Sequence, residues 1–205
     1  MAHHFRESLF TADVLRAQEA YYGRAQSLPP APGADELGAP EEAFISRRDS
    51  FYLASVNTAG WPYIQHRGGP RGFLKVLDGH TLAFADLSGN RQLLTTGNVA
   101  TNDRVALFLM DYPRRERLKI IGHAEIIPAA ANPAHAAEFA PEGVPVRKVE
   151  RVFRVRVTGY DWNCPQYITP RFTADEIAQT AAPLHARIAE LEAALAAARR
   201  ASPVR

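Results

Sequence analysis

The chain has 205 residues, of which 46% are hydrophobic and 22% charged, a composition that suits one ordinary globular domain with extensions. Its formal net charge of +2, and the absence of any basic run longer than Arg114–Arg117, give no indication of nucleic-acid binding. With no apolar stretch of about 18 residues, no secretory leader and a single cysteine, Cys164, we expect a cytoplasmic protein without a membrane span or an internal disulfide.

Residues 1–42 predict an N-terminal helical arm followed by a connector. Leu9, Val14 and Leu15 recur with Tyr21–Tyr22 at approximately helical spacing, and Gly23 is the residue type that commonly ends a helix. Residues 27–41 are rich in proline, which removes backbone donors and fixes φ. We therefore expect an irregular connector there rather than a helix or a central strand.

Residues 43–171 predict the main domain, because short β-type runs alternate with turns along this segment. Strands are expected at 51–57, 61–67, 73–77, 81–85, 105–111, 117–127 and 149–158, and short helices at 90–99 and 132–139. The run at 105–111 is almost wholly apolar, which indicates burial on both faces. Strands with short connections and no regular strand–helix alternation favour a closed or nearly closed antiparallel barrel, with a β-sandwich as the alternative.

Residues 172–205 predict a C-terminal helix. Thr173 with Glu176 three residues later is a capping box, the pattern that starts many helices. Leu184, Ile188, Leu191 and Leu195 then recur at steps of four, three and four, which is heptad spacing. Two interpretations stay open: the helix packs on its own barrel, or it contacts a second copy of the chain.

The familiar patterns of hydrolytic and metal sites are missing from the sequence. There is no G-x-S-x-G motif, and Cys164 lies in the run Trp162-Asn-Cys-Pro165 without a helix start behind it. The seven histidines are scattered without metal-ligand spacing, and adjacent carboxylates occur only in the connector and the helix cap. We therefore predict no nucleophilic residue and no metal site.

The segment 86–96, DLSGNRQLLTT, has two interpretations. It follows an apolar strand, so Ser88-Gly89-Asn90 can be an ordinary capped turn with a solvent-facing Arg91. It can equally be an anion seat, because backbone N–H groups at a helix start, amide side chains and a guanidinium together suit a phosphate.

Basic and amide side chains gather at strand ends elsewhere in the main domain. They are Arg67, Arg71, Lys75, Asn90, Arg91, Gln92 and Arg117. The loop around Gly68-Gly69 and Gly72 lets a flat or anionic ligand approach the backbone closely. The edge Gly72-Phe73-Leu74-Lys75 offers backbone hydrogen bonds to a planar heterocycle. Near the end of the domain, Asn163 and Gln166 carry amides that can both donate hydrogen bonds to a ring and accept them from it, so we hypothesise that they line the same pocket.

Four motifs in this order resemble the pyridoxamine 5′-phosphate oxidase-like, FMN-binding split-barrel superfamily, above all its bacterial flavin-nucleotide-binding branch. They are R-G-G-P-x-G-F from Arg67, D-x-x-G-N-R-Q from Asp86, L-K-I-x-G-x-A from Leu118 and W-N-C-P-Q-Y from Trp162. The resemblance extends from about Ser50 to Phe172, the whole of the expected barrel.

The resemblance implies a mainly β fold, a six- to seven-stranded antiparallel split barrel with flanking helices, and a homodimer that holds FMN at its interface. It implies that Arg67 and Phe73-Leu74-Lys75 lie beside the isoalloxazine, and that Arg117 contacts the flavin edge. It also implies that Asp86 and Asn90-Arg91-Gln92 form the phosphate seat, which favours the anion interpretation of 86–96.

The implied function is that of an FMN-dependent oxidoreductase, which transfers hydride or electrons through flavin N5 to or from a small-molecule substrate. Two departures from the vitamin B6 oxidases argue against pyridoxamine phosphate as that substrate: the Arg-x-His-x-Arg ending is missing, and Gln92 stands where a basic residue usually follows the phosphate-binding arginine. The alternatives are a flavin-binding sensor without turnover, and the same barrel binding deazaflavin F420 or haem.

Overall fold

The computed structural model describes residues 3–27, 35–162 and 166–201, and these fall into two units. The first unit comprises Met1–Asp111 and Glu116–Gln166, and the second comprises Tyr112–Arg115 and Tyr167–Arg205. The first unit holds the whole sheet, and the second holds the C-terminal helix.

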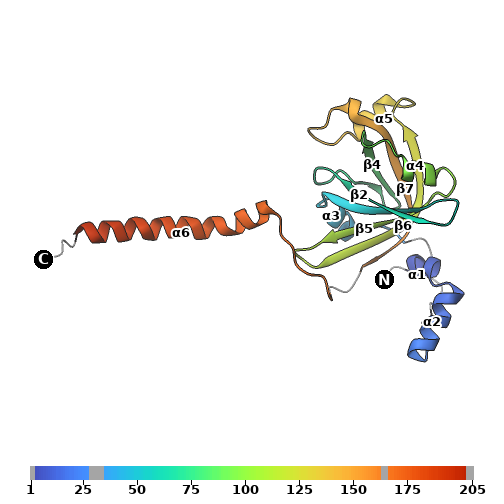
Figure 1. The fold of residues 1–205 in the computed structure, drawn as a ribbon, viewed down its shortest axis with the longest axis horizontal. Helices are drawn as coiled ribbons and strands as arrows, with labels where there is room; N and C mark the ends of the chain where they lie inside the picture. Colours follow the sequence, from blue (N-terminus) through green and yellow to red (C-terminus); the bar gives the residue numbers. More distant parts are fainter. Residues whose placement is uncertain (1–2, 28–34, 163–165, 202–205) are drawn as a thin grey trace. The chain divides into compact units, whose positions relative to one another are not determined.

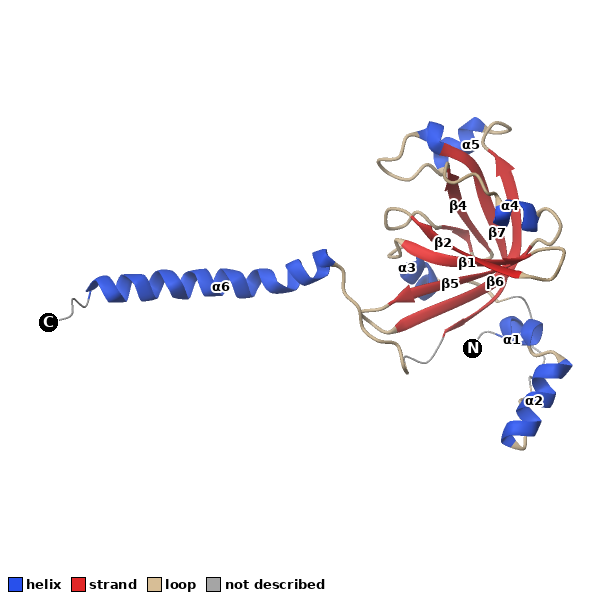
Figure 2. Cartoon of the chain, in the orientation of Figure 1, coloured by secondary structure: helices blue, strands red, loops and turns tan. Residues whose placement is uncertain are grey.

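Seven strands form one antiparallel sheet (Figures 1 and 2). They are β1 (Ser50–Val56), β2 (Pro62–Gly68), β3 (Lys75–Asp78), β4 (Thr81–Leu87), β5 (Arg104–Asp111), β6 (Glu116–Pro128) and β7 (Val149–Trp162). Their order is β2-β1-β5-β6-β7-β4-β3, so β2 and β3 are the two ends of a sheet that does not close. This is a split barrel, and it confirms the fold class expected from the sequence.

One face of the sheet forms the main hydrophobic core. Phe51 and Leu53 of β1, Phe84 of β4 and Phe153 of β7 are all at most 1% exposed. On β5 buried residues alternate with half-buried ones, because successive side chains of a strand point to opposite faces. The expectation that 105–111 is buried on both faces is therefore wrong within one chain: Ala106, Phe108 and Met110 stay partly exposed.

The described helices are α1 (His3–Leu9), α2 (Ala12–Tyr22), α3 (Ala39–Ile45), α4 (Leu94–Val99), α5 (Pro133–Glu138) and α6 (Ala174–Ala201), with a 3₁₀ turn at Val146–Lys148. The expected arm helix is thus two helices, because Thr11 caps a new one by accepting from the Val14 N–H. Gly23 ends α2 in the left-handed conformation, with φ of 69°, as expected.

Helix α3 lies partly inside the segment expected to be an irregular connector, so that expectation is wrong from Ala39 onward. The cause is local chemistry. Pro40 lies in the first turn, where the missing donor costs nothing, and the Glu41 carboxylate accepts from the Gly38 N–H at 3.0 Å.

Helix α1 packs against β7 at Gly159. A Cβ at this position would lie 2.4 Å from the backbone nitrogen of Phe5, so only glycine permits the contact. The Asp35 carboxylate accepts from the N–H groups of His3 and Phe5 at 2.9 and 3.2 Å, which satisfies two donors at the helix start. Part of the N-terminal arm is therefore joined to the barrel through specific contacts.

In the second unit, the capping box predicted for α6 is confirmed. The Glu176 N–H donates to Thr173 Oγ1 at 3.2 Å, and the Thr173 N–H donates to Glu176 Oε2 at 2.8 Å. The guanidinium of Arg171 lies 4.9 Å from the centre of the Tyr112 ring in the same unit. Among the described residues, no helix has both the length and the apolar character needed to cross a membrane.

Candidate functional site

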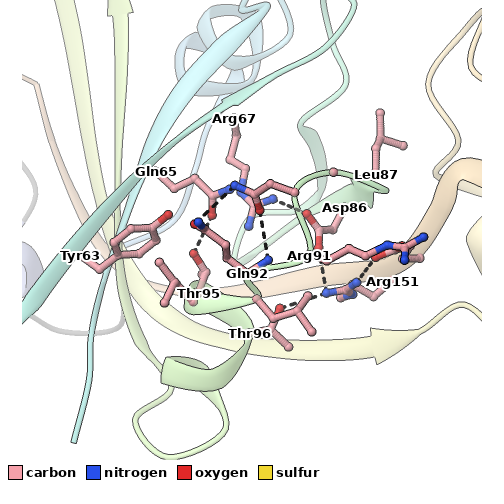
Figure 3. Close-up of a pocket in the computed structure, with 15 residues that line it drawn as sticks. Tyr63, Gln65, Arg67, Asp86, Leu87, Arg91, Gln92, Thr95, Thr96 and Arg151 are labelled. Carbon is pink, nitrogen blue, oxygen red and sulfur yellow. Dashed lines mark hydrogen bonds and ion pairs between the residues drawn. The ribbon is translucent and has the colours of Figure 1, made fainter.

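A pocket of about 190 Å³ lies where the end of β4 and the turn after it meet β2, β7 and the start of α4 (Figure 3). The described residues that line it are Tyr63, Gln65, Arg67, Asp86, Leu87, Gly89, Asn90, Arg91, Gln92, Leu93, Leu94, Thr95, Thr96, Glu150 and Arg151. Most of these side chains are polar or charged, which indicates a site for a polar ligand.

Asp86 holds two arginines in this pocket. Its Oδ1 accepts from Arg67, and its Oδ2 lies 3.3 Å from a guanidinium nitrogen of Arg151 (Figure 3). All three side chains are at least 87% buried, so these ion pairs are poorly screened by water. The pairing follows from the sheet register, because Asp86 on β4 lies opposite Arg151 on β7. Arg151 also donates to Thr96 Oγ1 at 3.2 Å and pairs with Glu150.

Strand β2 supplies one wall of the pocket through every second residue. Tyr63, Gln65 and Arg67 point to the same side of the strand, as Figure 3 shows. Gln65 Oε1 accepts from the hydroxyl of Thr95 at 2.9 Å, which ties this wall to the first turn of α4. The Arg67 guanidinium lies 5.3 Å from the centre of the Phe153 ring, and this contact helps to hold the guanidinium in place.

The turn between β4 and α4 has an unusual backbone. Arg91 and Leu93 have φ of 61° and 55°, in the left-handed region that residues other than glycine seldom adopt. A left-handed residue followed by helical ones turns successive N–H groups toward a common side, and this concavity binds anions. Leu93, Leu94 and Thr95 are such a sequence, and the first N–H groups of α4 have no carbonyl partner within the helix.

The pocket carries net positive charge. Three guanidinium groups, from Arg67, Arg91 and Arg151, face two carboxylates, from Asp86 and Glu150. Arg67 Nε is buried and has no hydrogen-bond partner in the described chain, so one strong donor remains for a ligand. Arg91 is exposed at the pocket mouth and is free to turn toward an anion. The arrangement fits a phosphate group.

The family model described as pyridoxamine 5′-phosphate oxidase matches residues 40–161, more than half of the chain. The chain belongs to this family. No curated protein matches the chain.

Solved structures with a similar fold include proteins with different names. An F420 reductase is 24% identical, covering 58% of this chain and 94% of its own, with a TM-score of 0.44. A protein related to general stress protein 26 from Clostridium acetobutylicum is 13% identical, and the match covers 67% of this chain and 94% of its own, with a TM-score of 0.47. The haem storage protein HutZ from Vibrio cholerae is 15% identical, and the match covers 62% of this chain and 94% of its own, with a TM-score of 0.44. At these identities and scores, the likenesses do not indicate which ligand this member of the family binds.

The structure brings together five of the residues singled out from the sequence: Arg67, Asp86, Asn90, Arg91 and Gln92. The last three form a turn in which the Asn90 side chain accepts from the Gln92 N–H at 3.1 Å. Helix α4, however, begins at Leu94 and not at Asn90, because the left-handed residues at 91 and 93 interrupt helical geometry. Arg91 and Gln92 thus lie before the helix start that was expected to contain them.

The other predicted residues do not line this pocket. Phe73 and Leu74 are core residues, 6% and 1% exposed, and Gly72 packs against Ser46 with φ of 79°. Since β3 begins at Lys75, Phe73 and Leu74 lie in the loop before it. Lys75 donates to the carbonyl of Glu138 at 2.9 Å, beside α5.

Arg117 and Gln166 are also not among the described residues that line the pocket. Arg117 stacks over Phe108 at 5.4 Å, and its Nε is buried without a partner in the described chain. Gln166 is exposed in a turn. Asn163 lies outside the described residues, as does Cys164. The roles given to these positions beside a flavin ring remain predictions.

Sequence reasoning missed Tyr63, Gln65, Thr95, Thr96 and Arg151. The signal for the first two was present, since they precede Arg67 at the two-residue period of a strand. Thr95 and Thr96 are the last two residues of the segment 86–96, but nothing in the sequence singled them out within it. Arg151 gave no such signal: it lies 65 positions after Asp86, and only the register between β4 and β7 brings the two together.

Proposed function

We propose that this chain is an FMN-binding oxidoreductase whose pocket between β2, β4, α4 and β7 holds the phosphate of the cofactor. The observation that carries the proposal is the set of three guanidinium groups, one with an unpartnered buried Nε, beside the backbone concavity at Leu93–Thr95. Membership of the pyridoxamine 5′-phosphate oxidase family, whose members commonly bind flavin, supports the same ligand.

In this proposal each residue has a defined task. Arg91 and Arg151 neutralise phosphate charge, Arg67 Nε donates to it, and Asp86 positions the two buried guanidiniums. Asn90 and Gln92 hold the turn in the shape that presents its N–H groups. When bound, the flavin would supply hydride or electron transfer through N5, and the protein would supply binding, orientation and electrostatics.

The size of the pocket supports a shared site. Its volume of about 190 Å³ is below the range of about 300–1,000 Å³ that is typical of whole small-molecule sites, so it suits the phosphate end of the cofactor. The ring would then extend onto another surface, which in our proposal a second copy of the chain completes. The buried, unpartnered Nε of Arg117 is a candidate donor to the flavin edge on that surface.

Support for a homodimer comes from the outer face of the sheet. Cross-strand neighbours on this face, Ile64, Ala54, Ala106 and Ile121, form one apolar row across β2, β1, β5 and β6. Tyr52 and Phe108 are paired in the adjacent row. A hollow of about 470 Å³ lies between these strands and the residues Phe5 and Leu9 of α1, and it is lined almost wholly by apolar atoms. Such a surface is typical of an interface between proteins.

The decisive experiment combines ligand release with a titration. The chromophore of the purified protein is released and identified, and apo-protein is then titrated with FMN. We expect FMN to be recovered, and we expect Arg91→Ala to weaken its binding by about 1.5–3 kcal/mol, the scale of a charge-assisted hydrogen bond, with unchanged thermal unfolding of the apo form. An unchanged affinity for FMN would show that residues 90–92 form an ordinary turn and do not bind the phosphate.

The same experiment separates the alternative cofactors. The described lining of the pocket contains neither histidine nor cysteine, so the phosphate interpretation fits it better than a haem site with one of these as ligand. Deazaflavin F420 also carries phosphate, and its absorption spectrum distinguishes it from FMN. Steady-state NAD(P)H oxidation with added acceptors then distinguishes an oxidoreductase from a sensor without turnover.

A further inference from the structure

Helix α6 carries a heptad pattern that extends beyond the four residues visible as a seam in the sequence. With Ile188 placed at position a, the a positions are Ala181, Ile188 and Leu195, and the d positions are Ile177, Leu184, Leu191 and Ala198. The pattern therefore covers 22 of the 28 residues of α6. Pro183 falls at position c, away from the a/d stripe.

This stripe is not buried in the described structure. Four large apolar side chains on this helix, those of Leu184, Ile188, Leu191 and Leu195, are between 51% and 65% exposed. Exposure of so many apolar side chains on one helix is unfavourable in water. A seam of a and d residues alone, with alanine or charged residues on most other positions, is narrower than the face a helix usually presents to a globular core. The pattern matches the seam of a coiled coil.

The residues of the seam and its flanks select the partner and its direction. At the centre of the seam, β-branched Ile188 at a with Leu184 and Leu191 at d favours two parallel strands, whereas Ile177 at d and Leu195 at a near its ends do not. In a parallel pair, position g of one helix lies beside position e of the next heptad on the other helix. Here these are Arg187 and Glu192, which carry opposite charges. The other such pairs, Thr180 with His185 and Ala194 with Arg199, bring no like charges together at neutral pH.

Arg187 is available for this contact. Within its own helix it pairs with Glu190 at 2.6 Å, but both side chains are more than 60% exposed, and exposed pairs of this kind contribute little stability. Exchange of Glu190 for Glu192 of a second copy therefore costs little.

We propose that α6 pairs with α6 of a second copy of this chain as a parallel, in-register two-stranded coiled coil. The contact is symmetric, so a single two-fold axis relates the two copies. About three heptads make a weak coiled coil alone, and a second contact between the same two chains would raise the effective concentration of the helices. This contact involves no residue of the phosphate pocket, so the coiled coil and FMN binding can be tested separately.

Cysteine cross-linking of the full chain tests the proposal. In a Cys164→Ser background, one cysteine is introduced at a d position, by Leu184→Cys or by Leu191→Cys, and Ala193→Cys at the outward f position is the matched control. A disulfide needs Cα atoms about 4.4–6.8 Å apart. We expect both d variants to form interchain disulfides under mild oxidation at least about tenfold faster than the control, because only a and d positions meet across the seam.

The two d variants also test the direction. Positions 184 and 191 are one heptad apart, which is a rise of about 10 Å along the helix. An antiparallel pair cannot bring both positions next to their own counterparts, so cross-linking at only one of them would overturn the parallel arrangement. Cross-linking at neither above the Ala193→Cys control would show that α6 packs on its own chain or elsewhere, and would overturn the proposal.

A charge exchange tests the register independently. Arg187→Glu and Glu192→Arg each place like charges across the seam, and the double variant restores opposite charges there. We expect each single variant to slow cross-linking at Leu191→Cys and the double variant to recover it. The pair with Glu190 in the same helix is broken in the double variant as well, so recovery reports the contact between helices. Failure of the double variant to recover would exclude this register.

Discussion

At the scale of single residues, Asp86 organises the phosphate pocket. Its carboxylate is 7% exposed and pairs with Arg67 and Arg151, two cations that would otherwise repel each other in a buried position. It also reduces the positive field that a phosphate would experience. Asp86 therefore lowers the affinity of the pocket for an anion, but it stabilises the pocket and fixes its geometry.

This trade leads to the first prediction. Asp86→Asn removes the negative charge but keeps the shape of the side chain, so we expect the free energy of unfolding of the apo-protein to fall by about 1–3 kcal/mol. We also expect FMN or inorganic phosphate to raise the melting temperature of this variant more than that of the parent, because less negative charge opposes the ligand. Glu125→Gln, which alters an exposed pair with Arg154, is the control. Equal behaviour of the two variants would contradict the role of Asp86.

At the scale of elements, the end of β7 and helix α3 are joined by Trp162. Its indole N–H donates to Glu41 Oε1 at 2.7 Å, and its ring packs edge-on against Phe44 at 4.8 Å. Glu41 is 6% exposed and uses its other oxygen to cap α3. The tryptophan of the W-N-C-P-Q-Y motif thus has a structural role in the described chain.

The second prediction concerns this junction. Trp162→Phe keeps an aromatic ring but leaves a buried carboxylate oxygen without its donor, so we expect it to lower the free energy of unfolding by about 1–3 kcal/mol. Trp61→Phe is the matched control, since Trp61 is 73% exposed at a hairpin turn. Chemical denaturation measures both. A loss no larger than that of the control would show that the hydrogen bond is unimportant.

The third prediction is a pH dependence at the same junction. Burial, followed by the charges of Glu41 and Asp35, raises the pKa of Tyr160 above its ordinary value of 10.0. The unfolded chain therefore loses this proton at lower pH than the folded chain, so stability is lost as the pH rises through about 10. Between pH 9 and 11, the free energy of unfolding should fall less steeply for Tyr160→Phe than for the parent. Parallel slopes would contradict the raised pKa.

At the scale of the whole molecule, the apolar outer face of the sheet is the feature that a single chain leaves unexplained. Ile64 is 63% exposed at the β2 end of this face and lines the same hollow as Tyr52 and Phe108. Burying such a row against a second copy removes apolar area from water, which is the main driving force of association. The same contact would place two phosphate pockets in one assembly.

The fourth prediction tests this surface. The parent should be a dimer by light scattering at micromolar concentration, and Ile64→Asp should shift it toward monomer, because a carboxylate would be buried at the interface. Leu77→Asp is the control, since Leu77 is 43% exposed on β3, at the other end of the sheet from β2. A parent that is monomeric and still binds FMN at full stoichiometry would rule out a site completed by a second copy.

Local pattern determined much of this protein from the sequence alone. The two-residue period of the strands and the Thr173–Glu176 cap depend on neighbours in sequence, and the structure bears them out. The resemblance carried by four motifs gave the split barrel and the family. It also placed Asp86 and Arg91 in one phosphate seat, whereas Arg67 was expected beside the flavin ring and instead lines the same pocket as these two residues.

Tertiary structure decided what depends on distant partners. Arg151 reaches Asp86 only through strand register, and α3 forms in a proline-rich segment because Glu41 meets both a helix cap and Trp162. Helix α4 starts at Leu94 and not at residue 90 as expected, because Arg91 and Leu93 adopt left-handed backbone conformations. No local preference of arginine or leucine predicts these conformations. Phe73 and Leu74 were assigned to a ligand edge but pack in the core, since an apolar side chain in a loop takes whichever buried surface the fold provides.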